Sequence, residues 1–600
     1  MGRRATAAVV ALTLAATTVI AVLTGGTPAG AAPDTTPPNG TVAVPAPNAA
    51  LTGPSPVVRG TATDNVGVTN VDYVVRDRST SRWLQANGTW ATTFVWLPAT
   101  LAAPGSKSTA WSATLPLGTG SYALQVRARD GARNVDPTKP WVPFTVTGTP
   151  PPPPPPPPGT KPNVVLILTD DQRWDTTAVM PNVQSQLADK GVTFTNGFVV
   201  DSLCCPSRAT IMKGAYSHST KVYQLTGPDG PFGGKYDDSS TIATWLDGAG
   251  YRTALVGKYY NGYDLTRGTY VPPGWDKWAA IATNDVGGGS YYDYDLSLDG
   301  SLRHYGSATA DYSTDVLAQQ AEDFVRSTPA GDPLFLWFSP YGPHEPATPA
   351  PRHQSMFSNL SPWRPPNYNE ADVSDKPAFI RSIASFSSAT TQRIDGLRRN
   401  QLRSLQSVDD AVGRLVQALA DTGRLENTMI VFTSDNGFLW GEHRWGGTGD
   451  RNKQVAYEES IRTPFVVRYD RAVSAPRSDS RLVTVMDLAP TWAALAGVGA
   501  PGAEGVSLMP LLDQSATTWR SDFLVEHGLT GFPAFCAVRS TSDLYVQYAT
   551  GEEELYDLAA DPYELQNRAS DAASASTLTA RRARAHQLCV PTPPNFTWRH

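Results

Sequence analysis

The alternation of hydrophobic and polar positions changes along the chain and divides it into two parts with different expected folds. In residues 34–148, apolar and polar side chains alternate in short segments such as 68–75 and 122–130. Gly, Asn, Asp and Pro separate these segments, and no helical spacing interrupts them. A period of two is typical of strands with one buried face, so this part is expected to be an all-β sandwich.

The second part, from Asn163 onward, has the pattern of an α/β domain. Residues 164–168 are a continuous apolar run, which is typical of a strand buried on both faces, and residues 429–433 are expected to be a second buried strand. Residues 314–327 and 402–420 carry apolar side chains at helical spacing. Strands that alternate with helices predict a mostly parallel central sheet, with its functional site beyond the carboxyl ends of the strands.

Residues 149–162 connect the two parts and include an unbroken proline run over residues 150–158. Such a run adopts polyproline II at about 3.1 Å per residue, which makes a semi-rigid strut of roughly 28 Å. A docking site for a partner that reads proline-rich ligands is the alternative. A linker is the commoner role in an exported protein, so we place the domain boundary here.

Residues 1–32 have the pattern of an export signal. Arg3 and Arg4 precede an apolar run over residues 7–23, and small side chains at 29–32 offer a cleavage site. A membrane anchor is the alternative, but the run is rich in Ala and Thr, and no other segment approaches the length of a membrane span. We therefore expect a secreted, extracellular protein with no stable membrane insertion after signal cleavage.

Composition excludes some functions and sorts the cysteines. The 600-residue chain has a net charge of −6 at pH 7, which argues against a nucleic-acid partner. Of its four cysteines, Cys536 and Cys589 are the natural disulfide pair in an oxidising compartment. Cys204 and Cys205 are adjacent in the chain, and this pairing leaves Cys204 free for chemistry.

Cys204 lies where a helix is expected to start. Pro206 suits the first helical position, and residues 209–213 continue the helix up to Gly214, a favoured stop. Backbone N–H groups and the helix dipole favour negative charge near Cys204. Arg208, one turn later, adds a fork of donors that suits phosphate or sulfate. A structural cysteine near a helix cap is the alternative for an arbitrary Cys-Pro pair.

Acidic side chains follow both apolar strands: Asp170 and Asp171 the first, Asp435 and Asn436 the second. Because the carboxyl ends of strands in one sheet converge, these oxygens can share one site. Such a shell suits Ca²⁺, or Mg²⁺ where waters complete it. Taken singly, an Asp pair after a strand is more often a turn or helix cap. Beside the cysteine motif, metal ligation is the better interpretation.

Residues 204–208, Cys-Cys-Pro-Ser-Arg, resemble the signature of type I sulfatases. In that family the cysteine at position 204 is oxidised to a formylglycine (3-oxoalanine) nucleophile by a formylglycine-generating enzyme. Residues 202–208 look closest to the branch that removes 6-O-sulfate from N-acetylglucosamine, although Lys213 replaces a residue that is usually small. The resemblance implies an alkaline-phosphatase-like fold for residues 163–600, including a small C-terminal subdomain. It implies Ca²⁺ or Mg²⁺ held by Asp170, Asp171, Asp435, Asn436 and the oxidised Cys204.

The resemblance also gives roles to two lysines. Lys258 and Lys453 stand where sulfatases place sulfate-binding lysines, although a lysine taken alone is usually a solvated charge. Tyr260 replaces a histidine that is common in the family. Asn261 resembles instead the Lys-Tyr-x-Asn variant of the glucosamine-sulfatase branch.

Three histidines complete the candidate site. His344 lies in a proline-stiffened loop that matches a family Pro-His-x-Pro element and suits a positioned acid. His218 matches another family histidine and is our candidate for the base. His443 is expected to line the substrate pocket, with Trp440 or Trp445 stacking on a sugar face, and a packed loop histidine is the alternative.

We therefore expect a sulfatase that hydrolyses sulfate esters, with 6-O-sulfated N-acetylglucosamine-type residues of a glycan as substrate. A general arylsulfatase and a phosphate or phosphonate ester hydrolase are the alternatives within the superfamily. An inactive glycan-binding surface protein is the alternative of another class, against which the intact Cys204 and Arg208 argue. Residues 34–148 resemble, in strand pattern, immunoglobulin-like modules of secreted bacterial glycan-acting enzymes, so a spacer or surface-binding role is expected there.

Overall fold

The computed structural model describes residues 34–599 except for 53–55, 139, 148–159, 265–266, 283–290, 447–451 and 529–531. The expected export signal and proline run lie outside the described residues. The chain divides between residues 151 and 152 into two compact units, which are described separately. In the described ranges, no helix is both long enough and apolar enough to cross a membrane.

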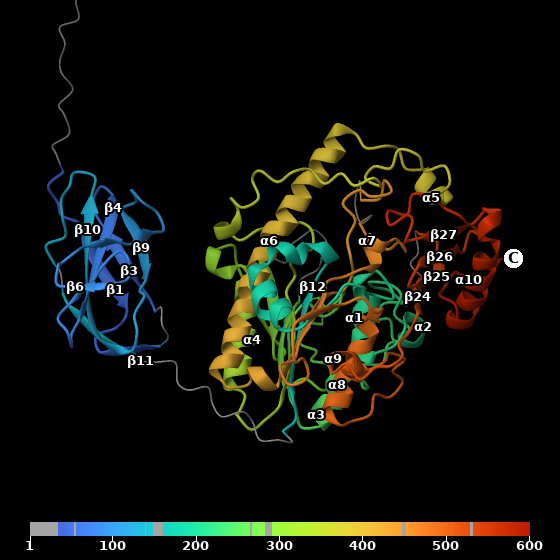
Figure 1. The fold of residues 1–600 in the computed structure, drawn as a ribbon, viewed down its shortest axis with the longest axis horizontal. Coiled ribbons are helices and arrows are strands. Elements are labelled where there is room, and N and C mark those ends of the chain that lie inside the picture. The colour runs from blue at the N-terminus through green and yellow to red at the C-terminus, as the bar shows by residue number, and fades with distance from the viewer. Residues whose placement is uncertain are drawn as a thin grey trace, which may run out of the picture. The chain divides into compact units, whose positions relative to one another are not determined.

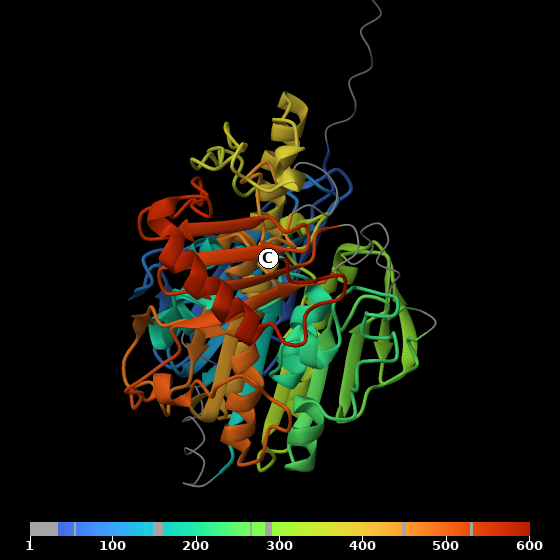
Figure 2. The ribbon, with the colours of Figure 1, turned by 90° about the vertical axis from the view of Figure 1, so that its right-hand side faces the viewer.

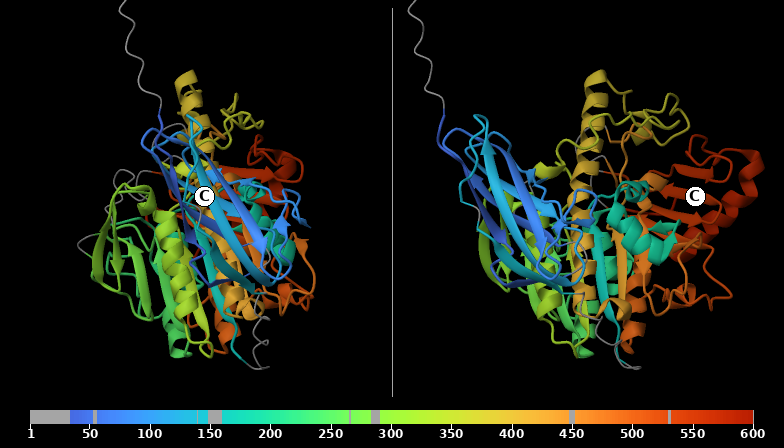
Figure 3. Two further views of the ribbon diagram at one scale, coloured as in Figure 1. Left: turned by 90° about the vertical axis from the view of Figure 1, so that its left-hand side faces the viewer. Right: turned by 60° about the vertical axis from the view of Figure 1, so that its left-hand side comes forward.

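The N-terminal unit consists of two sheets, drawn in blue to cyan in Figures 1 and 3. The four-stranded sheet has the order β1 (Asn39–Val44), β3 (Val57–Thr63), β9 (Ser108–Thr114), β8 (Thr100–Leu101). The other sheet has the order β2 (Ala49–Thr52), β11 (Val142–Thr147), β10 (Gly120–Asp130), β4 (Val68–Asp77), β5 (Trp83–Leu84), β6 (Trp90–Ala91), with β7 (Leu97–Pro98) paired to β4.

Period-two burial explains why these sheets pack together. Every second residue of β3 is buried, as alternation predicts for a strand with one inward face. Inward side chains from both sheets, among them Val58, Trp111, Leu124 and Phe144, form a single core. The sequence pattern thus predicted the strand-rich character of this unit.

The second unit contains a ten-stranded mixed sheet. Its order is β18 (Ser301–Tyr305), β17 (Tyr294–Leu298), β16 (Lys277–Ile281), β15 (Arg252–Gly257), β19 (Leu334–Ser339), β12 (Asn163–Thr169), β20 (Thr428–Ser434), β21 (Phe465–Arg468), β13 (Val192–Phe194), β22 (Arg477–Asp479). The five central strands from β16 to β20 run parallel, whereas β17, β18 and β21 are antiparallel to their neighbours. The two predicted apolar strands are β12 and β20, which are direct neighbours.

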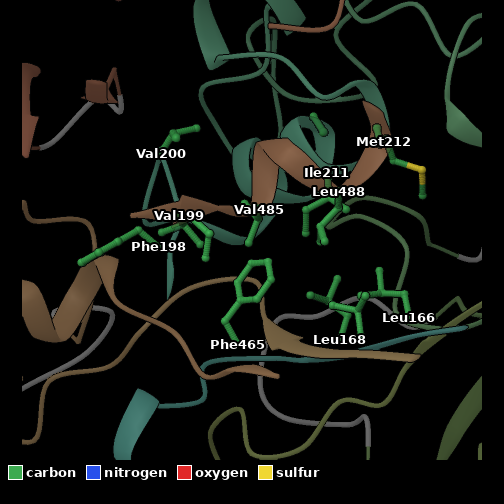
Figure 4. Close-up of a cluster of buried hydrophobic side chains, with 14 of the residues drawn as sticks. Leu166, Leu168, Phe198, Val199, Val200, Ile211, Met212, Phe465, Val485 and Leu488 are labelled. Carbon is green, nitrogen blue, oxygen red and sulfur yellow. The ribbon is translucent and has the colours of Figure 1, made fainter. Parts of the chain in front are cut away.

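Helices cover both faces of this sheet because successive side chains of β12 point in opposite directions. Leu166 and Leu168 pack on α1 (Cys204–Lys213), α3 (Ile242–Gly248) and α8 (Leu488–Ala496). Val165 and Ile167 pack on α4 (Ser313–Ser327) and α6 (Ser388–Asp421). Figure 4 shows the first of these contacts, where Leu166, Leu168 and Phe465 face Ile211 and Leu488. A strand buried on both faces therefore needs the continuous apolar run seen in the sequence.

A smaller antiparallel sheet ends the chain. It has the order β24 (Asp522–His527), β25 (Phe535–Ser540), β26 (Asp543–Tyr548), β27 (Glu553–Asp557). Helix α10 (Ala575–Leu588) lies across this sheet in Figure 2, and a disulfide joins Cys536 of β25 to Cys589 at the helix end. Other short elements include α2 (Ser217–Thr220), α5 (Ala378–Arg381), α7 (Glu458–Ile461), α9 (Met509–Leu512), β14 (Gly197–Phe198) and β23 (Val483–Thr484).

Candidate active site

The pairing of β12 with β20 brings the two acidic clusters together. Thr169 lies opposite Ser434 in register, so the chain leaves both strands at the same level. The Asp171 amide donates to Asp435 Oδ1 at 3.2 Å, and Asn436 Nδ2 donates to Asp171 Oδ1 at 2.7 Å. Asp171 has a left-handed backbone, φ +63°, a strained conformation of the kind found at functional sites.

Helix α1 places Cys204 and Arg208 beside these carboxylates. Arg208 Nε lies 2.8 Å from Asp435 Oδ2, and Arg208 Nη2 lies 3.4 Å from Asp170 Oδ2, so one guanidinium spans both clusters. Cys204 Sγ is 3.8 Å from Asp170 Oδ1. The helix begins at Cys204 rather than at Pro206, which occupies its third position, and Gly214 ends it with φ +66°. Pro206 is tolerated there because the first four helical N–H groups lack intrahelical partners.

Lys258 reaches the site from the end of β15. Its Nζ lies 2.6 Å from Asp170 Oδ2. Gly257, with φ +122°, lets the chain pass Ser339, because a Cβ there would lie 2.0 Å from the Ser339 carbonyl oxygen. The carbonyl oxygen of Lys258 accepts bonds from Ser339 Oγ at 2.6 Å and Arg208 Nη1 at 2.7 Å. Backbone and side chain of Lys258 are therefore both fixed.

Lys453 reaches the site from a loop that is tied to the Cys204 segment. Its Nζ donates to Asp171 Oδ1 and lies 2.9 Å from Cys204 Sγ. The Gln454 amide donates to the Ser202 carbonyl at 3.2 Å, and Ser202 Oγ donates to the Val455 carbonyl at 3.1 Å. These bonds hold the Lys453 ammonium against the sulfur.

Burial and charge act against each other on the ionisable groups of this cluster. Burial alone raises the pKa of Asp170, but Lys258, His344 and Arg208 outweigh it and hold that pKa well below its usual value. For Asp171, burial is likewise outweighed, chiefly by Lys453, and its pKa is lowered. Burial, reinforced by the charge of Asp170, raises the pKa of Asp435. Burial also raises the pKa of the Cys204 thiol strongly, so the unmodified sulfur is a poor nucleophile.

His344 lies at the solvent side of the cluster. Its side chain is 23% exposed, and its Nε2 lies 3.7 Å from Asp171 Oδ2. Nδ1 lies 2.7 Å from the Glu345 carbonyl oxygen, which can only accept, so Nδ1 carries a hydrogen. Nε2 is therefore the atom at which a proton can be held or released toward the site.

The donor set of the cluster fits a hard divalent cation. Asp170, Asp171, Cys204 and His344 each offer a ligand atom, and these atoms lie within 4.8 Å of one another. Asn436 Oδ1 is buried and accepts no hydrogen bond from the described residues. Carboxylate and amide oxygens are the ligands that Ca²⁺ and Mg²⁺ prefer. Three of the residues expected to hold the metal, Asp170, Asp171 and Cys204, are therefore together in one acidic cluster that can hold a divalent cation.

His218 lies in a different polar network from the one expected. Its Nδ1 is 3.0 Å from Glu526 Oε1, and its Nε2 is 3.6 Å from Glu504 Oε1. Burial lowers its pKa, but the hydrogen bonds that the ring donates to Glu504 and Glu526 outweigh burial and raise the pKa to about 9. The glutamates favour the protonated form of His218, and His218 is not part of the group formed by Asp170, Asp171, Cys204 and His344, so the structure gives no support to the base role expected of it.

His443 and its neighbouring tryptophans also differ from the expectation. His443 is fully buried, with Nδ1 2.7 Å from Glu370 Oε2, and burial lowers its pKa to about 4. Trp440 and Trp445 are 3% and 2% exposed and belong to the two hydrophobic cores. All three side chains are buried, which favours packing roles over contact with a substrate.

Two tyrosines support the site without having been expected there. The ring of Tyr341 contacts the His344 ring in a tilted arrangement, with the ring centres 4.7 Å apart, and Lys258 Nζ lies 5.5 Å from the centre of the Tyr341 ring. Tyr291 donates its hydroxyl to the His344 carbonyl at 2.8 Å. Tyr341 was visible in the proline-stiffened loop of His344, whereas nothing in the sequence near Tyr291 indicates its role.

Comparisons with known proteins agree with this geometry. The family model "Sulfatase" matches residues 162–498, and the model "N-sulphoglucosamine sulphohydrolase, C-terminal" matches residues 441–588. N-acetylglucosamine-6-sulfatase of Capra hircus is 32% identical over 454 residues, which cover 68% of this chain and 80% of that protein.

Two solved structures share the fold. One, in complex with its substrate D-glucosamine-2-N,6-O-disulfate, has a TM-score of 0.63 and 24% identity, and the match covers 71% of this chain and 97% of that one. Phosphonate monoester hydrolase of Agrobacterium radiobacter has a TM-score of 0.56 and 22% identity, with 71% and 95% covered. The chain therefore belongs to the sulfatase family and is a sulfuric ester hydrolase with similarity to N-acetylglucosamine-6-sulfatases.

Proposed function

We propose that this protein is a secreted sulfatase that removes 6-O-sulfate from glucosamine-type residues of a sulfated glycan. The observation that carries the proposal is the position of Cys204 Sγ, 2.9 Å from Lys453 Nζ and 3.8 Å from Asp170 Oδ1, inside one buried cluster of cations and carboxylates. The similarity to N-acetylglucosamine-6-sulfatase supports the choice of sugar. The disulfide between Cys536 and Cys589 suits an oxidising, extracellular compartment.

The proposal includes the division of the chain into regions. It comprises an export signal (1–32), an immunoglobulin-like sandwich (34–148), a proline-rich linker (149–162) and the sulfatase domain with its C-terminal subdomain (163–600). Two sheets that share one core support the sandwich, and the small sheet with α10 supports the subdomain.

Cys204, and not Cys205, is the residue converted to formylglycine. Cys205 Sγ accepts a bond from the Asn261 amide at 3.2 Å and so faces a packed loop rather than the cations. The conversion oxidises the Cβ of Cys204 to an aldehyde: a formylglycine-generating enzyme uses molecular oxygen and two electrons from a thiol reductant, the sulfur leaves as hydrogen sulfide, and the second oxygen atom becomes water. Because the Cys204 side chain is 1% exposed in the folded protein, that enzyme must act before folding is complete.

A divalent metal, Ca²⁺ or Mg²⁺, would be held by Asp170, Asp171, Asp435, Asn436 and residue 204. When bound it supplies positive charge that polarises the sulfate oxygens. The protein's own side chains supply the remaining positive charge. Arg208, Lys258 and Lys453 give three further cations around one small volume, which suits a sulfate group that gains charge on its bridging oxygen during cleavage.

The reaction proceeds in two balanced steps. One hydroxyl of the hydrated formylglycine passes its proton to a neighbouring carboxylate of the cluster and attacks sulfur in line, the bond from sulfur to the sugar oxygen breaks, and His344 Nε2 gives that oxygen its proton. The second hydroxyl then loses its proton, sulfate leaves, and the aldehyde is restored. We assign the base of this second step to His344, which is neutral after the first. Its ligand atom lies within 4.8 Å of Cys204 Sγ, whereas His218 is held by glutamates.

Mass spectrometry of the tryptic peptide that contains residue 204, on enzyme of measured activity, tests the nucleophile. We expect formylglycine at position 204 and an intact thiol at 205. An unmodified Cys204 in fully active enzyme would falsify the proposal.

Substrate choice is tested by kcat/KM on N-acetylglucosamine 6-sulfate, nitrophenyl sulfate, nitrophenyl phosphate and a phenyl phosphonate ester. We expect the sugar sulfate to be the best substrate. A higher value for the aryl sulfate identifies a general arylsulfatase, and a higher value for either phosphorus ester identifies a phosphate or phosphonate hydrolase. No turnover of any of them by enzyme that carries formylglycine supports the inactive glycan-binding alternative.

A further inference from the structure

The outer face of the larger sheet in the N-terminal unit carries a row of aromatic rings, here called the aromatic face. Its rings are Trp83 of β5, Phe94, Trp96 and Trp141. The ring centres of Trp83 and Phe94 are 4.8 Å apart, and those of Trp83 and Trp141 are 5.8 Å apart. Phe94 and Trp96 follow at 5.6 Å. The four rings are therefore one continuous surface feature rather than isolated side chains.

The aromatic face remains in contact with solvent. Trp141 is 41% exposed, the highest fraction among the sixteen tryptophans of the chain, and Phe94 is 45% exposed. The rings lie outside the core of this unit, which is closed on the other side of the sheet by residues such as Val75 and Leu124. A contiguous exposed patch of large apolar rings costs solubility, and such patches mark interaction sites. This patch therefore needs a partner.

Arginines accompany the rings. The Arg127 guanidinium lies 4.3 Å from the centre of the Trp96 ring, and the Arg76 guanidinium lies 5.7 Å from that of Trp83. Asp72 is shared by Arg127 at 2.8 Å and Arg129 at 2.6 Å, so one carboxylate serves two cations. Arg76 donates to Ser81 Oγ at 3.0 Å and forms no salt bridge with any described residue. The face thus carries excess positive charge.

The charge of the whole module agrees with this local excess. Residues 34–148 contain nine Lys or Arg and six Asp, with no Glu, which gives a net charge of +3. The complete chain has a net charge of −6. A basic module on an acidic enzyme attracts a polyanion at a site separate from the catalytic one.

We propose that the aromatic face binds a sulfated polysaccharide, and this choice of ligand rests on the proposed function. Sugar rings have apolar C–H faces that stack on aromatic rings, and sulfate groups pair with arginine forks. Rings and cations alternate along one surface, as a chain of sugars with charged substituents requires. An uncharged glycan would make no use of the excess positive charge of this face, and a second, net acidic copy of this chain would not explain the row of rings in contact.

Binding is tested on the whole chain with Cys204→Ala, so that no turnover occurs. Fluorescently labelled heparin is the probe, chemically desulfated heparin is its counterpart that keeps the carboxylates but lacks sulfate, and N-acetylglucosamine 6-sulfate in excess blocks the active site. The test variants are the pair Phe94→Ala with Trp141→Ala, and separately Arg76→Gln. Val57→Ala and Val66→Ala are the matched controls, because Val57 and Val66 are 52% and 60% exposed on the same unit outside the aromatic face.

We expect the aromatic pair to weaken heparin binding about tenfold and Arg76→Gln to weaken it about threefold, since each ring or charge contact contributes a modest share. The valine variants and turnover of the small sugar sulfate by enzyme with intact Cys204 should stay unchanged. Equal affinity of the aromatic variants and the valine controls overturns the proposal, as does equal binding of desulfated heparin.

Thermal unfolding of each variant checks the fold, and Trp141→Gln replaces the pair if the pair unfolds early. The two proposals can fail independently. A protein that turns over no sulfate ester but binds heparin through these rings contradicts only the proposed function. A protein that turns over the small ester but ignores heparin contradicts only the aromatic face.

Discussion

Replacing His344 with alanine tests the proposed division of labour in the site. His344 is 23% exposed, whereas the side chains of Lys258 and Lys453 are 6% and 8% exposed, so it is the group that a leaving sugar reaches first. A sugar alkoxide is a poor leaving group and needs a proton as the bond breaks. Nitrophenolate leaves without one.

The expected loss follows from this difference. A positioned acid contributes about 10²- to 10⁴-fold to a rate, so kcat/KM on N-acetylglucosamine 6-sulfate should fall by that factor. On nitrophenyl sulfate the fall should be smaller, because nitrophenolate leaves without a proton and only the base role of the second step is lost.

The fold should survive this substitution. Alanine removes the 2.7 Å bond to the Glu345 carbonyl, worth about 1 kcal/mol, and the ring contact with Tyr341, worth about 0.5–1.5 kcal/mol. These losses are small beside a typical stability of about 5–15 kcal/mol.

Steady-state kinetics on both substrates is the assay, with thermal unfolding to check the fold. His353→Ala is the matched control, since His353 pairs with Asp410 at 2.9 Å outside the cluster and should leave both rates unchanged. His344→Gln keeps an N–H donor but cannot transfer a proton, so it should recover little of the loss on the sugar. Equal losses on the two substrates would show that His344 is not the leaving-group acid.

Three other predictions concern the nucleophile, the metal and pH. Cys204→Ala should abolish turnover while Cys205→Ala keeps most of it, and the reverse ranking in turnover assays would contradict the assignment of the nucleophile. Chelation should stop activity and Ca²⁺ or Mg²⁺ should restore it, while Asp435→Ala should weaken metal binding measured by calorimetry; a metal-free preparation with full activity would refute this. Because the pKa of His218 is raised from 6.5 to about 9 in the folded protein, the stability that its protonation contributes is present below about pH 6.5 and is lost as pH rises through about 9. Melting temperatures across that range should show the loss, His218→Gln should flatten it, and an unchanged slope in that variant would contradict the network.

Several features of the fold and site could be predicted because they depend on local pattern. The continuous apolar runs at β12 and β20 indicate strands buried on both faces, and two such strands in one sheet place Asp170 and Asp435 at the same edge. Cys204 at a helix start and Gly214 at its end follow from the preferences of single positions. Alternation alone predicts the strands of the N-terminal unit.

Other features depend on contacts between distant segments and could not be predicted this way. His218 matches a family histidine, and His443 lies in sequence between the acidic cluster and Lys453. In the fold, however, His218 contacts Glu526 and His443 contacts Glu370, which place them in separate networks. From the sequence, Trp440 and Trp445 could equally well stack on a sugar ring or pack in the interior. Only their burial in the two hydrophobic cores indicates packing.

The sequence by itself determined the classes of the two units, the strand ends that carry the carboxylates and the cysteine that starts α1. Only the tertiary structure decided which cations meet those carboxylates and which aromatic rings remain exposed, as at Trp141. The physical reason is the separation along the chain of the residues that interact. Strand and helix patterns arise from neighbours a few residues apart, whereas burial and ion pairing are set by side chains such as Lys453 and Asp171, which lie 282 residues apart in the chain.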